Sequence, residues 1–241
     1  MGKSLFSRIR FYLFYIFLCS FFFSCATTEI QNLDPADPWE SSNRSVHEFN
    51  DTLDRWFLKP TAKAYNFVTP NFLQTGISNI FSNIGSIGSA VNNLLQGKLL
   101  GFSSELSRVV INSTIGIYGV FDVASSLGIN AKSEDMGQTL GYWGVGSGPY
   151  MVVPFYGPTT VRDFSSIVPE IYITPSIPDD YSARLAAASL NVVNIRSSLL
   201  SVSDLSGNDQ YSFYRDAYLQ RREYVISDGK LDESLFEDEF D

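Results

Sequence analysis

Apolar residues recur at helical spacing in several long stretches of the chain. The first stretch opens at Asp37-Pro38-Trp39-Glu40, which places Asp at the N-cap, Pro at the first helical position and Glu at the third. Behind it, apolar side chains fall at offsets of 0, 3, 7, 10 and 11: Val46, Phe49, Leu53, Trp56 and Phe57. This spacing predicts an amphipathic helix, and Pro60 predicts its end.

A second apolar stripe begins after Thr69-Pro70. Its members lie at offsets of 0, 4, 7, 8 and 11, which is one face of a helix: Leu73, Ile77, Ile80, Phe81 and Ile84. The stripe continues to Leu95, but Gly85 and Gly88 interrupt it, and glycine weakens a helix interior. We therefore expect a kinked helix or a helical hairpin here.

Glycine and proline are concentrated in the middle of the chain, where 14 of the 17 glycines fall between positions 76 and 157. Residues 141–150 contain glycine too often for a helix or a regular strand. Residues 152–158 are apolar and are expected to be extended or turn-rich, and Pro169, Pro175 and Pro178 indicate a loop.

Two further helices are expected near the C-terminus. After Asp179-Asp180, apolar side chains repeat at helical spacing from Tyr181 to Leu199, and Asn208-Asp209 would cap a last helix. Residues 227–241 hold seven acids and one Lys and are predicted to be a disordered tail. Together these patterns predict an all-α fold with a Gly/Pro-rich irregular segment.

Residues 1–24 have the features of a secretory signal peptide. Three basic residues and no acid precede the 13-residue apolar run at 11–23, which is too short to span a bilayer. The run ends at Ser24-Cys25, a small residue before cysteine, which resembles a bacterial lipoprotein cleavage site with Cys25 as the lipidated residue. Cys19 fits less well because bulky Leu18 precedes it, and an ordinary cleaved signal peptide is the alternative.

Cleavage before Cys25 would change the composition of the chain. It leaves 14 basic against 26 acidic residues and no second cysteine, and residues 25–33 become a lipidated tether. The lipoprotein sorting pattern, with Ala26 rather than Asp after the cysteine, implies an outer-membrane protein anchored on the periplasmic side.

Charge and composition exclude several functions. A net charge of −9 opposes nucleic-acid binding, which needs clustered Lys and Arg. Residues 141–148 lack the order and the following Lys-Ser/Thr of a phosphate-binding loop, and Gly146-Ser147-Gly148 does not match a serine-hydrolase motif. No cofactor or metal is expected, and we predict that the protein is not an enzyme.

A few charged and polar residues are expected to be structural. His47, the only histidine, would be an exposed surface residue next to Glu48. Arg162-Asp163 is expected to form an ion pair, as is Asp209 with Arg215 and Arg222.

Motifs over residues 34–226 resemble the MlaA/VacJ family of outer-membrane lipoproteins. The opening D-P-x-E-x-x-N-R…F-N…L-D is matched from Asp37 to Asp54, and the chain departs from the family pattern at Ser42, at Gly85-Ser86 and at Phe164. The residues that carry the resemblance, as structural or channel-forming positions, are Asn43, Arg44, Phe49, Asn50, Gly137, Gln138, Thr139, Trp143, Gly144, Gly146, Gly148, Pro149, Tyr150, Arg162 and Asp163.

The resemblance implies a flat, ring-shaped, all-α lipoprotein that lies in the inner leaflet of the outer membrane. Such a protein removes phospholipids that have strayed to the outer leaflet, passes them to a soluble periplasmic carrier and associates with a trimeric porin. Amphipathic helices without a spanning segment agree with a place at a membrane interface.

Two other functions remain open. A structural adaptor that holds a porin without moving lipid would share the anchor and the apolar stripes. A lipase acting on the same lipids would need a nucleophile and a base, which the motifs do not supply.

Overall fold

The computed structural model describes residues 34–175, 177–201 and 209–230. The predicted signal peptide, Cys25, the tether and residues 231–241 of the acidic tail lie outside this part of the chain. The described elements, in chain order, are α2 (Glu40–Leu53), η1 (Asp54–Leu58), α3 (Lys59–Val68), α4 (Asn71–Leu95), α5 (Leu99–Thr114), α6 (Val123–Ser126), α7 (Met136–Tyr142), β1 (Tyr150–Val153), β2 (Gly157–Thr160), α8 (Val161–Ile173), α9 (Tyr181–Ser198) and α10 (Gln210–Ile226).

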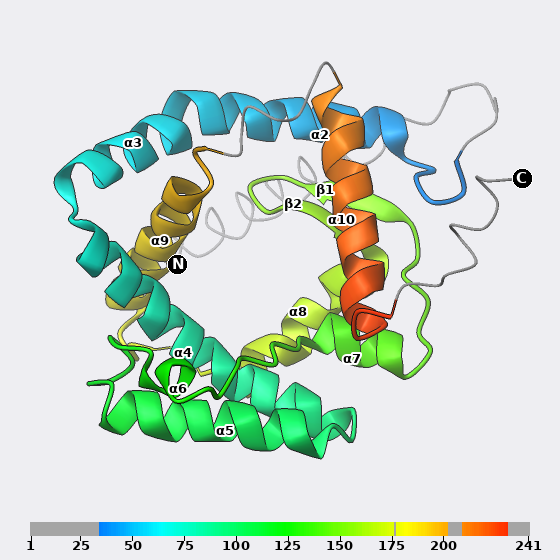
Figure 1. Ribbon diagram of the computed structural model, residues 1–241. Helices are drawn as coiled ribbons and strands as arrows, with labels where there is room; N and C mark the ends of the chain where they lie inside the picture. The colour runs from blue at the N-terminus through cyan, green and yellow to red at the C-terminus, as the bar shows by residue number, and fades with distance from the viewer. Residues whose placement is uncertain (1–33, 176, 202–208, 231–241) are drawn as a thin grey trace, which may run out of the picture.

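The helices trace a closed ring, as Figure 1 shows. α2, η1 and α3 form one side, α4 and α5 pack against each other along the opposite side, and α7, α8 and α10 complete the circuit. α9 packs against α3 and α4, and the β1–β2 hairpin projects into the ring. The expected all-α, ring-like fold is confirmed, with this antiparallel hairpin as its one described sheet.

The helix that was expected to end at Pro60 continues through it to Val68. Proline in a helix interior lacks an N–H and clashes with the carbonyl four residues earlier. The preceding turn is a π-helix, η1, in which Lys59 N–H bonds to the carbonyl of Asp54, five residues back. This wider turn makes room for the proline ring, so the helix does not break.

Of the kinked helix or helical hairpin expected at Gly85 and Gly88, the hairpin is wrong, because α4 is a single helix from Asn71 to Leu95. Gly88 is needed for packing: a Cβ there would clash with Thr174 Oγ1 and Glu170 Oε1 at the end of α8. Glycine therefore allows α8 to approach α4 closely.

Pro169 lies inside α8 rather than in a loop. Glu170, the next residue, accepts hydrogen bonds from Asn92 Nδ2 (3.1 Å), Met136 N–H (2.9 Å) and Thr174 Oγ1 (2.8 Å). These bonds to α4, α7 and the end of α8 hold the segment in helical conformation despite the missing N–H.

The predicted N-cap at Asp37 is wrong, since α2 begins at Glu40 behind Trp39. The Asp37 carboxylate is instead fully buried, where it accepts from Asn43 Nδ2 (2.8 Å) and from the Tyr211 hydroxyl of α10. The predicted cap at Asp209 is confirmed, and Asp180 caps α9 in the same way: each carboxylate accepts from the backbone N–H three residues on.

Two asparagines of α2 fasten the hairpin to the ring. Asn43 donates to the carbonyl of Tyr150 (3.1 Å) and accepts from the N–H of Val152 (2.9 Å). Asn50, two turns later on the same face, donates to the carbonyl of Val153 (3.0 Å) and accepts from the N–H of Phe155 (2.8 Å). Each side-chain amide thus donates one hydrogen bond and accepts another, as the peptide group of a neighbouring strand would.

Replacing Asn43 should weaken this attachment. Asn43→Ala leaves the buried groups of Asp37, Tyr150 and Val152 without that partner, and each unsatisfied group costs about 1–3 kcal/mol. We expect the free energy of unfolding in mild detergent, measured by denaturant titration, to fall by about 2–4 kcal/mol. Ser45→Ala, at an exposed position of α2, is the control; equal losses in both variants would contradict the assignment.

Candidate functional site

The residues that this ring buries are mainly polar. In the described part of the chain, seven hydrophobic side chains are buried against twenty polar or charged ones. Many large apolar side chains are exposed instead, among them Trp56 (75%), Phe67 (90%) and Leu100 (88%). Amides and charges are seldom fully buried in proteins surrounded by water, and apolar exposure of this extent is rare there. The outer surface is better matched to an apolar surrounding.

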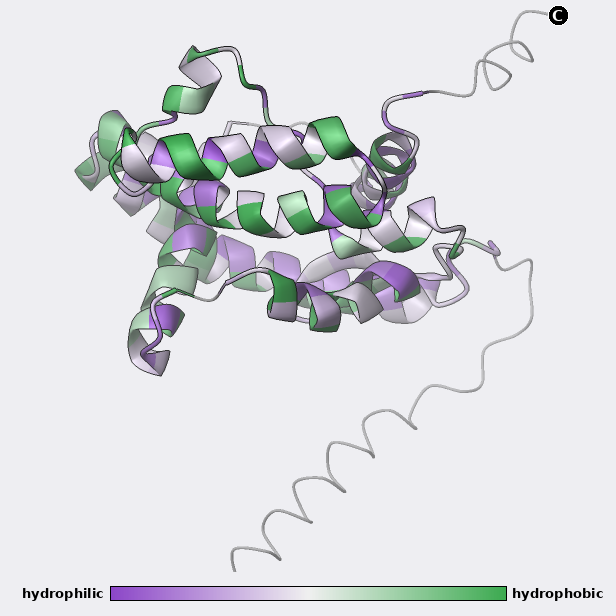
Figure 2. Ribbon diagram, turned by 90° about the horizontal axis from the view of Figure 1, so that it is seen from below, coloured by the Kyte–Doolittle hydropathy of each residue, from purple (hydrophilic) through white to green (hydrophobic). Residues whose placement is uncertain are grey.

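Exposed apolar side chains occur on α3, α5, α8 and α9, and Figure 2 shows apolar turns alternating with polar ones along the helices. None of the described helices is both long enough and apolar enough to cross a bilayer.

One exposed apolar turn is held in a strained conformation. Ile117 and Tyr118, just after α5, have φ of 53° and 54°, and both side chains are exposed. Positive φ is unfavourable for a β-branched residue and is found mainly at functional positions. The N–H groups of Tyr118 and Gly119 bond to the carbonyls of Ser113 (3.1 Å) and Asn112 (2.8 Å), which fixes the turn.

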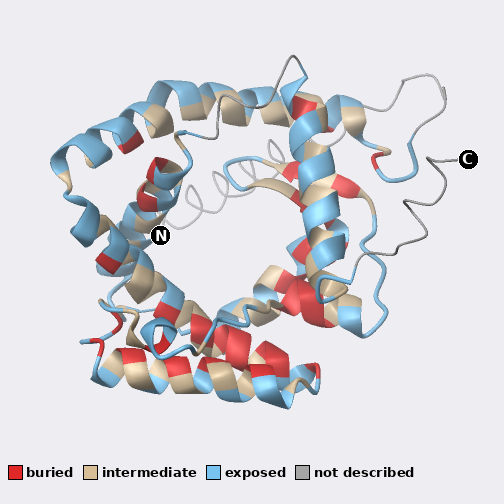
Figure 3. Cartoon of the chain, in the orientation of Figure 1, coloured by how far each residue is buried: buried red, intermediate tan, exposed pale blue. Residues whose placement is uncertain are grey.

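Buried amides and hydroxyls join α4 to α7, where Figure 3 shows buried residues gathered. Thr139 Oγ1 donates to Asn92 Oδ1 (2.9 Å) and accepts from Gln96 Nε2 (3.0 Å). Gln138 Nε2 donates to the carboxylate of Glu134 (2.6 Å). Of these two expected motif positions, Thr139 joins α7 to α4 and its C-cap, whereas Gln138 bonds to the segment just before α7.

Asp163 is the centre of a second buried polar cluster, which we call the Asp163 cluster. Its carboxylate accepts from Arg162 Nε (2.9 Å), Arg222 Nη2 (3.1 Å) and the hydroxyl of Tyr218 (2.7 Å). Arg222 also forms two bonds to Asp135, the N-cap of α7. The cluster thus joins α7, α8 and α10, and confirms the expected Arg162–Asp163 pair.

The contacts of the Asp163 cluster lower the pKa of its carboxyl group. Burial alone would raise the pKa of Asp163, but the hydrogen bonds from Arg162 and Tyr218 and the charge of Arg222 outweigh burial and hold that pKa below its ordinary value. Gly137 is required beside this cluster, because a Cβ there would lie 2.6 Å from Arg222 Nη2.

The remaining motif residues lie in two places. Arg44 forms a double hydrogen bond with Asp209 (3.0 Å each), and Phe49 makes an edge contact with Phe155 at 5.4 Å between ring centres. Tyr150 is buried in a small core with Val152 and Tyr211. The loop after α7 contains the other motif residues: Trp143, Gly144, Gly146, Gly148 and Pro149. Trp143 donates to the carbonyl of Leu95 (3.2 Å), and the carbonyl of Pro149 accepts from the N–H of Val161 (3.1 Å). Gly144 and Gly148 have positive φ.

Two expectations about charged and polar side chains are wrong. Asp209 pairs with Arg44, whereas Arg215 pairs with Asp216 and Arg222 with Asp135 and Asp163. His47 is partly buried against the rings of Tyr211 and Tyr214, and burial lowers its pKa. Among residues 34–175, 177–201 and 209–230, no group of three His, Cys, Asp or Glu side chains is placed to hold a metal ion.

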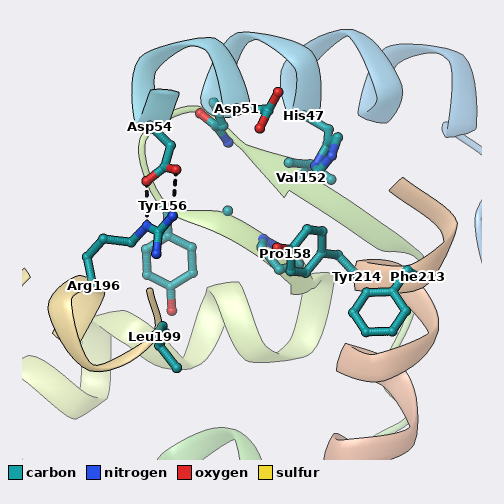
Figure 4. A pocket seen from close by; sticks show the side chains of 12 residues that line it. His47, Asp51, Asp54, Val152, Tyr156, Pro158, Arg196, Leu199, Phe213 and Tyr214 are labelled. Carbon is teal, nitrogen blue, oxygen red and sulfur yellow. Dashed lines mark hydrogen bonds and ion pairs between the residues drawn. The ribbon is translucent and has the colours of Figure 1, made fainter. Parts of the chain in front are cut away.

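A pocket of about 460 Å³ lies on the inner side of the ring, between α2, η1, the hairpin, α9 and α10 (Figure 4). Of the expected motif residues, Asn50 alone lines it. Sequence reasoning missed Asp51, Arg196 and Tyr214, because the pocket joins segments that are far apart in the chain.

The fold and this site define a class of protein: a ring of amphipathic helices with polar contacts buried between its elements, many exposed apolar side chains and a pocket facing inward. Comparison with known proteins identifies the family. The family model described as MlaA lipoprotein matches residues 35–225, and the chain belongs to that family.

Individual relatives agree with this assignment. A protein of Rickettsia bellii is 34% identical over 79% of this chain and 76% of its own length. The intermembrane phospholipid transport system lipoprotein MlaA of Escherichia coli is 29% identical over 86% of this chain and 85% of its own. A solved structure described as "Structural basis for maintenance of bacterial outer membrane lipid asymmetry" is 31% identical, with a TM-score of 0.71, and covers 79% of this chain and 98% of the solved one.

Removing the carboxylate of Asp163 should destabilise the ring in a pH-dependent way. Asp163→Asn leaves Arg162 and Arg222 with one partner fewer, and breaking a buried pair costs about 3–5 kcal/mol. Because the folded-state pKa is depressed, the stabilisation is present above the unfolded pKa of about 4 and is lost as pH falls through the folded pKa.

The difference in free energy of unfolding between wild type and Asp163→Asn should therefore shrink from pH 7 to pH 3. Denaturant titrations in mild detergent at both pH values measure it. Asp216→Asn, which alters an exposed ion pair, should change little at either pH. A difference that stays constant with pH would refute the assignment.

Proposed function

We propose that this protein is an outer-membrane lipoprotein, anchored through Cys25 on the periplasmic side, that removes mislocalised phospholipid from the outer leaflet. The lipid passes through the ring to a soluble periplasmic carrier, which maintains lipid asymmetry. The observation that carries the proposal is the polarity of a closed ring: its buried side chains are mainly polar, whereas many large apolar side chains are exposed. The names of its relatives in Escherichia coli and Haemophilus influenzae support the same role.

The ring would sit in one leaflet with its apolar edge against acyl chains. Exposed Trp39, Trp56 and Trp143 would lie at the level of the headgroups, where aromatic residues with a polar edge collect. A helix that lies in the interface buries its apolar face there without spanning the bilayer.

The inner side of the ring would lower the barrier for a headgroup. A phospholipid crosses hydrocarbon slowly because its headgroup loses water without gaining partners. In the inward pocket, Asp51, Asp54 and Arg196 would supply such partners, while the acyl chains would stay against apolar surface.

Delivery to water is the costly step. Exposing two acyl chains costs ~0.8 kcal/mol per CH₂, which amounts to tens of kcal/mol, so a carrier must dock before the lipid leaves. We propose that the protein is passive and performs no covalent chemistry, with direction set by the lipid gradient and by its carrier. Association with a trimeric porin would hold the ring in the leaflet.

An apolar-to-charged change on the outer edge should weaken membrane association. In the unacylated Cys25→Ala protein, Phe67→Glu places a charge on a 90% exposed position of α3 and should lower partitioning to zwitterionic vesicles several-fold. Co-sedimentation measures this. Lys63→Glu introduces the same residue one turn earlier at an exposed position; equal loss in both variants would mean that charge, not apolar contact, controls association.

Lipid removal itself can be tested in intact cells that lack the gene. Outer-leaflet phospholipid should rise, and complementation by the wild type should correct it. Cys25→Ala should be mislocalised and should fail to correct it. Normal outer-membrane fractionation of Cys25→Ala would refute the anchor.

The adaptor function is the second candidate, since an apolar outer edge would also bind a porin. Unchanged surface phospholipid after a clean deletion, with porin association intact, would favour it over lipid removal.

A further inference from the structure

The inward-facing pocket contains charges of both signs on a largely apolar wall. Asp51 and Asp54 come from α2 and η1, and Arg196 comes from α9. Figure 4 shows Asp54 and Arg196 at one side of the pocket and Phe213 and Tyr214 at the other. The volume of about 460 Å³ falls in the ~300–1,000 Å³ range of small-molecule sites.

The two carboxylates lie close together on one helical face. Asp51 and Asp54 are three residues apart, which places them on neighbouring turns of the same side. Asp54 accepts two hydrogen bonds from Arg196, at 2.7 and 2.9 Å, and Asp51 pairs with Arg55 at 2.5 Å. A carboxylate has about four lone-pair directions, so both keep capacity for a further donor.

The charges favour a ligand that is itself zwitterionic. A primary ammonium can donate N–H bonds to Asp51 and Asp54, whereas a quaternary ammonium has no N–H to donate. The Arg196 guanidinium bonds to Asp54 through Nε and Nη2, and its positive charge attracts a phosphate placed beside it. With His47 neutral, the charged groups lining the pocket sum to one negative charge, which opposes a headgroup that carries phosphate alone.

We propose that this pocket is a headgroup subsite for phospholipid with a primary ammonium, that is, a phosphoethanolamine headgroup. The inference rests on the proposed lipid transport and adds a headgroup preference to it. The ammonium binds between Asp51 and Asp54, the phosphate lies beside Arg196, and the glycerol end faces the apolar side near Phe213.

The single histidine of the chain provides a direct probe. His47 lines the same pocket, so one imidazole signal in the NMR spectrum of the full-length protein in detergent micelles reports on it without assignment. The protein is titrated at constant pH with glycerophosphoethanolamine, glycerophosphoglycerol or inorganic phosphate.

Glycerophosphoethanolamine should produce a saturable shift of the His47 signal. Glycerophosphoglycerol and inorganic phosphate should bind at least tenfold more weakly. An equal response to inorganic phosphate would show a plain anion site, and an equal response to glycerophosphoglycerol would remove the headgroup preference; either result, or no shift at all, overturns the proposal.

A variant pair tests the ammonium contact. Asp51→Asn should weaken glycerophosphoethanolamine binding about three- to tenfold, because it removes one of the two carboxylates. Glu48→Gln, exposed on α2 and outside the pocket, removes the same charge and should leave binding unchanged. A wild-type midpoint of thermal unfolding before titration verifies that each variant is folded, and equal binding by both variants overturns the ammonium contact.

Failure of the subsite and failure of the proposed function remain distinguishable. If no probe binds but deletion still raises surface phospholipid, the subsite is wrong and lipid removal stands. If glycerophosphoethanolamine binds selectively but deletion leaves surface phospholipid unchanged, lipid removal is wrong.

Discussion

A buried polar group without a hydrogen-bond partner costs about 1–3 kcal/mol. In this protein, buried polar groups from different segments of the ring are partners of one another. Asn43 and Asn50 pair with the hairpin backbone, and Asp163 joins three helices. The hydrophobic core between these contacts is small, centred on Tyr150, Val152 and Tyr211. Polar bonds across distant segments therefore determine the shape, which hydrophobic packing determines in most proteins of this size.

The apolar periodicity predicted the positions of α2, α4, α9 and α10, because helical spacing is a local property. The prediction failed at proline and glycine, which break or weaken a helix in some surroundings and are accommodated or needed for packing in others. Pro60 was expected to end a helix, but the π-turn before it accommodates the ring. Gly88 was expected to weaken α4, but its missing side chain is what lets α8 approach. Both outcomes depend on contacts that no local pattern contains.

The motif residues were identified from the family resemblance, but their contacts could not be deduced from sequence. Several of them connect separate segments, as Asn43 and Thr139 do and as Arg162 does through the carbonyl of Val145. The inward pocket depends on pairs such as Asp54 and Arg196, which are 142 residues apart. A long-range ion pair produces no periodic pattern in the sequence. Arg196 therefore could not be distinguished from any other helical arginine without the structure.

The separation of polar and apolar contacts has a consequence for movement of lipid. In an apolar surrounding, exposed side chains such as Phe67 and Leu100 gain nothing by leaving lipid for the protein interior, so hydrophobic collapse does not compete with an open ring. The polar contacts are directional and keep their geometry. A ring held by directional polar contacts can keep the side chains of its inner wall in fixed positions, while acyl chains exchange freely along its edge. Selection by headgroup requires both.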